Sequence, residues 1–78
     1  MGDYDRPERQ AIIKRGLIGL GLDYKHAKNH DVATCPNTNR KTTIPRHKKL
    51  NKYTVGSIVD FLLANDYNEA EVKKAFKW

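Results

Sequence analysis

Apolar residues near the N-terminus repeat at the spacing of an α-helix. Before this stripe, Asp5 can cap free amide groups, Pro7 suits a first helical turn, and Glu8 stands in capping-box position. Gly21 is expected to end the helix in a left-handed conformation. The stripe itself recurs at three- and four-residue steps and consists of Ile12, Ile13, Leu17, Ile18 and Leu20.

The helical period is lost between residues 22 and 45, where short extended runs alternate with turn residues. Strands are predicted over residues 22–26, 30–35 and 40–44, with Pro45 ending the third. Residues 36–39 (Pro-Asn-Thr-Asn) are turn formers, so the last two strands should form a hairpin. Alternation along the second strand puts His30, Val32 and Thr34 on one face, and Asp31, Ala33 and Cys35 on the other.

A second, cleaner helical pattern follows a basic loop at residues 46–52. Thr54 is expected to cap this helix, and residues 65–66 should end it. A short last helix should begin at Asn68, with Glu71 three residues later in capping-box position and with Tyr67 and Val72 placed as a hydrophobic staple. The core-facing stripe of the longer helix consists of Val55, Ile58, Val59, Leu62 and Leu63.

The predicted order of elements is α-β-β-β-α, followed by the short terminal helix. An α+β fold with a three-stranded antiparallel sheet and helices on one face is the economical packing for this order. The length of 78 residues predicts a single domain, residues 1–78, with one modest core. If the protein is an enzyme, its site must therefore lie on an open surface.

Charge is distributed unevenly along the chain, which has a net charge of +6. No carboxylate lies between Asp31 and Asp60, and outside this window acidic and basic residues balance. An electropositive segment of this kind suits a polyphosphate partner such as RNA, because phosphate neutralisation releases counterions. It is equally the composition of a solvated loop. The segment carries the whole excess of positive charge: Arg40, Lys41, Arg46, Lys48, Lys49 and Lys52.

Several classes of protein are disfavoured by composition. One cysteine, Cys35, excludes an intramolecular disulfide, and the three scattered histidines lack the spacing of a zinc site, so neither a metal nor another cofactor is expected. No apolar run reaches the length of a membrane span, and the N-terminus is acidic where a secretion signal is basic. We therefore expect a cytoplasmic protein.

Three parts of the sequence, residues 30–36, 40–47 and 50–63, resemble HicA-type toxins, a family of type II toxins that act as mRNA interferases. That family has a Gly-Ser-His type strand, a turn, a Thr-hydrophobic-Pro-Arg-His ending, a basic loop and a final helix opening near a threonine. The ending is written here as Thr43-Ile44-Pro45-Arg46-His47, and the helix opens at Tyr53-Thr54-Val55. The resemblance implies a double-stranded-RNA-binding-domain-like fold, metal-independent endoribonuclease activity, and a HicB-type antitoxin covering the active site.

The resemblance places His30 at the family's catalytic histidine. A histidine can take up a proton near neutral pH, and the RNA 2′-hydroxyl can attack its own adjacent phosphate without a metal. The alternative is a strand histidine that is hydrogen-bonded across the hairpin. His26 is expected to be peripheral. The residues before His30 are Lys28-Asn29, where the family usually has Gly followed by Ser or Thr.

The basic residues around His30 are candidates for phosphate contacts. Lys28 would share a face with His30 if the chain is extended there, or it is a solvated edge lysine. Arg46 suits a bidentate phosphate contact, and His47 is a candidate acid for the leaving oxygen. The others are expected to follow the RNA backbone without reading its sequence, namely Arg40, Lys41, Lys48, Lys49 and Lys52.

Three functions remain open from the sequence. The first is a toxin ribonuclease restrained by an antitoxin. The second, prompted by the altered Lys28-Asn29 pair, is a non-catalytic RNA- or DNA-binding module that keeps the basic surface without the chemistry. The third is a protein-interaction domain whose basic loop docks on an acidic partner.

Overall fold

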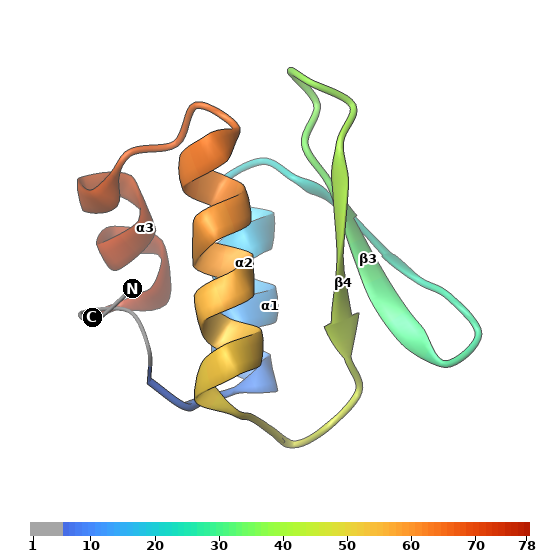
Figure 1. The fold of residues 1–78 in the computed structure, drawn as a ribbon. Coiled ribbons are helices and arrows are strands. Elements are labelled where there is room, and N and C mark those ends of the chain that lie inside the picture. The colour runs from blue at the N-terminus through green and yellow to red at the C-terminus, as the bar shows by residue number, and fades with distance from the viewer. Residues whose placement is uncertain (1–5) are drawn as a thin grey trace.

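The computed structural model describes residues 6–78, which form three helices and five strands. In chain order the elements are β1 (Glu8–Arg9), α1 (Gln10–Gly19), β2 (Asp23–His26), β3 (His30–Thr34), β4 (Lys41–Pro45), β5 (Lys49–Leu50), α2 (Lys52–Ala64) and α3 (Glu69–Phe76) (Figure 1). The predicted α+β class and the short terminal helix are confirmed.

The main sheet is antiparallel and has the order β2-β3-β4, as the hairpin pattern predicts. Within β3, Asp31 pairs with His26 of β2 on one side and with Ile44 of β4 on the other. The last pair of β4 joins Pro45 to His30. Proline is tolerated there because β4 lies at the edge of the sheet, where its missing N–H group breaks no ladder.

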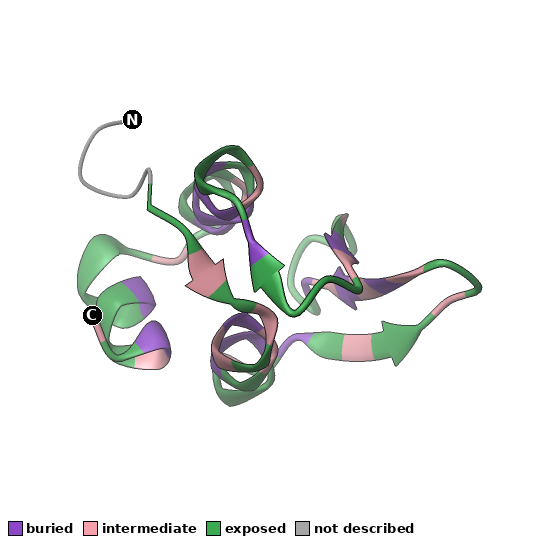
Figure 2. Ribbon diagram, turned by 90° about the horizontal axis from the view of Figure 1, so that it is seen from below, coloured by how far each residue is buried: buried purple, intermediate pink, exposed green. Residues whose placement is uncertain are grey.

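The helices form two layers beside the sheet. Helices α1 and α2 cover one face of the sheet, and α3 packs on their far side, mainly against α1 (Figure 1). Buried positions gather where these layers face one another (Figure 2). The largest side chains of the resulting core are Ile13, Leu17, Ile44, Leu50, Ile58, Leu62 and Phe76.

Side-chain alternation along β3 decides which residues enter this core. Asp31, Ala33 and Cys35 are buried beneath the helices, whereas His30 and Val32 are only half-buried on the opposite face. The predicted division of the strand into two faces is confirmed. Its consequence is that a carboxylate lies at an interior position of the fold.

The start of α1 differs from the sequence prediction. Asp5 lies outside the described residues, and both Pro7 and Glu8 precede the helix, whose N-cap is Arg9 without a side-chain capping bond. Residues of β1 pair with β5 instead, and the backbone N–H of Gln10 donates to the backbone carbonyl of Lys48 at 3.0 Å. Because backbone pairing satisfies this amide, the helix begins later than its local sequence predicts.

The start of α2 also differs, because Asn51 rather than Thr54 is its N-cap. The Asn51 side chain accepts a hydrogen bond from the Thr54 amide at 2.9 Å, so Thr54 lies inside the first turn. Two other predicted termini are confirmed. Gly21 follows α1 with a φ of 93°, and Asn68 and Glu71 form the expected capping box at the start of α3.

We expect Asn68→Ala to lower the free energy of unfolding by about 1 kcal/mol, since the Glu71 amide loses its acceptor. Urea denaturation followed by circular dichroism measures this change. Asn68→Asp is the matched control, because aspartate keeps a capping oxygen and should be close to the wild type. Equal loss in the two variants would contradict the capping explanation.

Candidate active site

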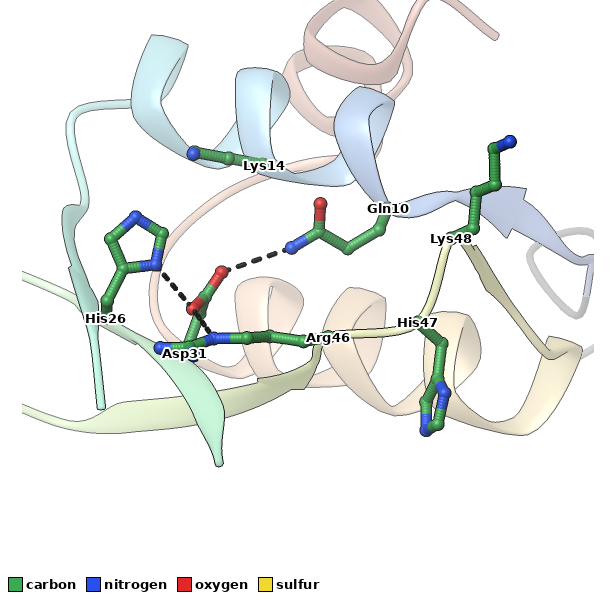
Figure 3. Close-up of a pocket in the computed structure, with 7 residues that line it drawn as sticks. All are labelled: Gln10, Lys14, His26, Asp31, Arg46, His47 and Lys48. Carbon is green, nitrogen blue, oxygen red and sulfur yellow. Dashed lines mark hydrogen bonds and ion pairs between the residues drawn. The ribbon is translucent and has the colours of Figure 1, made fainter. Parts of the chain in front are cut away.

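The Asp31 carboxylate is the centre of a hydrogen-bonded cluster at one end of the sheet. Asp31 is 1% exposed, and burying a charge costs free energy unless other groups form hydrogen bonds to it. Tyr24 donates to Oδ2 at 2.7 Å and Gln10 donates to the same oxygen at 3.1 Å. Oδ1 accepts from Arg46 Nε at 2.9 Å and lies 2.7 Å from His26 Nδ1 (Figure 3).

These bonds keep Asp31 ionised. Burial by itself raises the pKa of Asp31, but hydrogen bonds from Tyr24, Arg46 and His26 outweigh burial and hold that pKa well below its ordinary value. Burial, together with the bond to Asp31, raises the pKa of the Tyr24 hydroxyl. Tyr24 therefore remains a hydrogen-bond donor and Asp31 an anion over the physiological pH range.

His26 is the most exposed partner of this carboxylate. It is the last residue of β2, and its side chain is 63% exposed although it contacts a buried group. Because an ionised carboxylate only accepts hydrogen bonds, the bond at 2.7 Å requires a proton on Nδ1. The other ring nitrogen, Nε2, points away from Asp31 toward the side of the site where Lys14 lies (Figure 3).

Arg46 connects the cluster to the turn between β2 and β3. It follows Pro45 at the end of β4, and besides its bond to Asp31 it donates from Nη2 to the carbonyl oxygen of Ala27. Its side chain remains 42% exposed. The guanidinium is thus fixed in position by two acceptors while part of it faces solvent.

An open pocket of about 320 Å³ lies over this cluster. Lys14 reaches it from α1, with its ammonium group 5.6 Å from the centroid of the Tyr24 ring. In Figure 3 the side chains of His47 and Lys48 point away from the Asp31 carboxylate. Among the described residues that line the pocket, the acidic one is Asp31, and its charge is offset by the Arg46 guanidinium. The residues that line the pocket are Gln10, Lys14, His26, Asp31, Arg46, His47 and Lys48.

His30 lies at the same end of the sheet but on the other face. It pairs with Pro45, next to Arg46 in the chain, yet strand alternation directs its side chain away from the face that carries Asp31. Within the described residues the His30 side chain has no hydrogen-bond partner. The bond across the hairpin is thus absent there, and a catalytic role for His30 stays a prediction.

Lys28 is exposed in the turn between β2 and β3 and not on an extended strand. The expectation that strand alternation would place it on one face with His30 is therefore wrong. A tight turn is needed to bring His26 opposite Asp31, and this requirement takes Lys28 out of the ladder. Its position at the same end of the sheet as Arg46 keeps it a candidate for phosphate contact.

The basic segment predicted from the sequence is divided between separate places in the fold. Lys41 pairs with Thr34, at the opposite end of the β3–β4 hairpin from His30 and Pro45, and Arg40 precedes it. The two ends are four residue steps apart along the strand, a distance of about 14 Å. The hairpin thus keeps Arg40 and Lys41 away from the pocket.

The remaining lysines follow the pocket along the chain. Lys48 and Lys49 are exposed between β4 and α2, where Lys49 pairs with Arg9, and Lys52 is the first residue of α2. The Lys52 ammonium lies 5.2 Å from the centroid of the Tyr53 ring. Tyr53 is 76% exposed, so it is a surface residue and not part of the core.

The sequence predicts a peripheral position for His26, whereas in the structure His26 lines the pocket and is bonded to Asp31. His26 ends one strand and Asp31 is the second residue of the next, so a tight antiparallel turn sets them directly opposite each other. The available signal was an aspartate in a strand position that alternation assigns to the core. Such a residue needs donors, and a histidine just across the predicted turn was the nearest one.

Residues 6–78 contain no group of three or more His, Cys, Asp or Glu side chains placed to hold a metal ion. No helix in this range has the length and apolar character needed to cross a membrane. Comparisons with protein-family models, with curated proteins and with solved structures found no match for the chain.

Proposed function

We propose that this protein is a HicA-like toxin that cleaves RNA without a metal ion in the cytoplasm, and that a HicB-like antitoxin restrains it. One observation carries the proposal. In the pocket a histidine is fixed by a buried carboxylate and is flanked by Lys14 and Arg46. The sequence resemblance around residues 43–47 supports the same reaction. It also supports the proposal that the α+β fold is of the double-stranded-RNA-binding-domain type.

The charge of the pocket favours a phosphodiester as ligand. Arg46 presents the exposed part of a fixed guanidinium, and Lys14 adds a second cation from α1. The site is an open surface pocket, which suits a segment of nucleic-acid chain that enters and leaves at its edges. The exposed lysines that continue from it toward α2 would bind further phosphates along the strand.

The chemistry favours RNA over DNA. In the proposed metal-independent reaction the nucleophile is the 2′-hydroxyl, which lies beside the phosphate it attacks and is absent from DNA. One side chain that takes the hydroxyl proton and cations that stabilise the charge on phosphorus are then sufficient. A histidine beside Arg46 and Lys14 supplies both.

Purified protein is expected to cleave single-stranded RNA in the presence of EDTA and to leave 2′,3′-cyclic phosphate and 5′-hydroxyl ends. Gel electrophoresis with end-group analysis measures this. The same oligonucleotide made with 2′-deoxyribose at every position is the matched control and should stay intact. Binding is expected to weaken steeply with salt, because phosphate contacts release counterions.

Other outcomes of this experiment identify the competing functions. Salt-dependent binding without product would support a non-catalytic nucleic-acid-binding module in place of the ribonuclease. Absence of binding at low salt would exclude both and leave a domain that docks on an acidic protein surface.

A further inference from the structure

We propose that His26, fixed by Asp31, is the residue that takes the proton from the RNA 2′-hydroxyl. The inference rests on the proposed ribonuclease function and names the catalytic group within it. It assigns the chemistry to the face of the sheet that carries the pocket, and not to the face that carries His30.

The first argument is the orientation and tautomer of the His26 ring. Its Nδ1 carries the proton that is donated to Asp31 Oδ1 at 2.7 Å, so in the neutral ring Nε2 has the free lone pair. Nε2 points away from Asp31, and the side chain is 63% exposed (Figure 3). A base must offer its lone pair to an arriving hydroxyl, and this ring is held in the form that does so.

The second argument is the set of charged groups around the ring. Asp31 of β3 stabilises the imidazolium formed when Nε2 accepts a proton, and Tyr24 holds the carboxylate from the other side. Lys14 of α1 and Arg46 after β4 line the same pocket. They are placed to neutralise the phosphate whose ester bond is exchanged, so base and phosphate site share one surface.

The third argument is the contrast with His30. That side chain is half-buried on the opposite face of the sheet and has no hydrogen-bond partner within residues 6–78. No hydrogen bond from residues 6–78 therefore fixes the tautomer of His30. Of His26 and His30, His26 is the one that is bonded to a buried carboxylate and lines the pocket with Lys14 and Arg46.

The step is a transesterification in which water is not consumed. His26 Nε2 accepts the 2′-hydroxyl proton as the 2′ oxygen bonds to phosphorus. The bond from phosphorus to the 5′ oxygen breaks, its electron pair stays on that oxygen, and solvent water protonates it. The hydroxide left from water then takes the proton from His26, which restores the neutral ring and leaves a cyclic phosphate and a 5′-hydroxyl.

The test compares RNA cleavage by the wild type, His26→Ala and His26→Gln, with and without added imidazole. We expect the kcat of both variants for RNA cleavage to be about 10²–10⁴-fold lower than that of the wild type. Added imidazole should restore part of the His26→Ala activity, because it can occupy the vacated space and accept the proton. Circular dichroism and urea denaturation check that each variant is folded.

Lys25→Ala is the matched control, because Lys25 is an exposed cation on the same strand whose side chain alternates to the other face. It should cleave like the wild type. Two results would overturn the role of His26 and leave the ribonuclease function standing. One is that His26→Ala cleaves RNA at the wild-type rate, and the other is that it loses cleavage and added imidazole restores none of it. Absence of cleavage by the wild type overturns the ribonuclease function itself.

Discussion

An Asp31→Ala variant is expected to lose about 3 kcal/mol of unfolding free energy at neutral pH, the lower end of the cost of breaking a buried ion pair. The lower end applies because Arg46 and His26 are partly exposed and can regain water once the carboxylate is gone. Tyr24 and Gln10 also lose their shared acceptor. Chemical denaturation of the two proteins at pH 7 measures the difference.

Asp60→Ala provides the matched control for this substitution. Asp60 is an exposed carboxylate on α2, and its removal should change stability by less than about 0.5 kcal/mol. A loss in Asp31→Ala as small as that in Asp60→Ala would mean that the buried cluster adds nothing to stability.

The same carboxylate should make stability depend on pH in the acid range. The pKa of Asp31 is lower in the folded chain than its value of about 3.9 in an unfolded chain. The ionised Asp31 carboxylate therefore adds its full contribution to the free energy of unfolding above about pH 5. This contribution is lost as the pH falls, by at most about 1.4 kcal/mol per pH unit. Between pH 7 and pH 3 the stability difference between wild type and Asp31→Asn should shrink by about 1 kcal/mol. An unchanged difference would contradict a lowered pKa.

Gly16→Ala is expected to destabilise the protein by about 2 kcal/mol, although alanine is the better helix former. Gly16 is buried in α1 where α3 crosses it, and a Cβ atom there would overlap the Phe76 ring and approach the Ala75 carbonyl at 3.0 Å. Phe76 is 1% exposed, and because protein interiors are close-packed its ring cannot shift without displacing neighbouring core side chains. Thermal and urea denaturation measure the loss.

Gly19→Ala is the matched control, because a Cβ atom at Gly19 would meet nothing within 4 Å. The same chemical change in the same helix should be neutral or stabilise by about 0.5 kcal/mol, since it lowers the entropy of the unfolded chain. If both variants gained stability, the close packing of α3 on Gly16 would be refuted.

Much of the fold follows from local patterns in the sequence. The period-two alternation of residues 30–35 predicts both the strand and its buried face. The stripe from Val55 to Leu63 predicts α2, although Leu63 at its end is 36% exposed and not part of the core. The capping box of α3 is likewise a local signal confirmed by hydrogen bonds. The start of α1 was not predictable in this way, because pairing with a segment some forty residues later determines it.

The candidate site was only partly predictable. The sequence predicts a phosphate contact for Arg46, which does line the pocket, but it predicts a peripheral position for His26 and no role for Lys14. Sequence separation conceals the cluster, since its members come from α1, β2, β3 and the loop after β4. Conversely, Arg40 and Lys41 are near Arg46 in the sequence, and the hairpin carries them to the far end of the sheet.

Local patterns along the chain are enough to predict the type of each main element, the buried face of β3 and the excess of positive charge, because these depend on neighbours within a few residues. The contacts of Asp31 with His26 and Arg46, and the need for a small residue at Gly16 against Phe76, arise only in the folded chain. Strand register and helix crossing set those contacts. Both depend on the packing of the whole chain, which local periodicity does not specify.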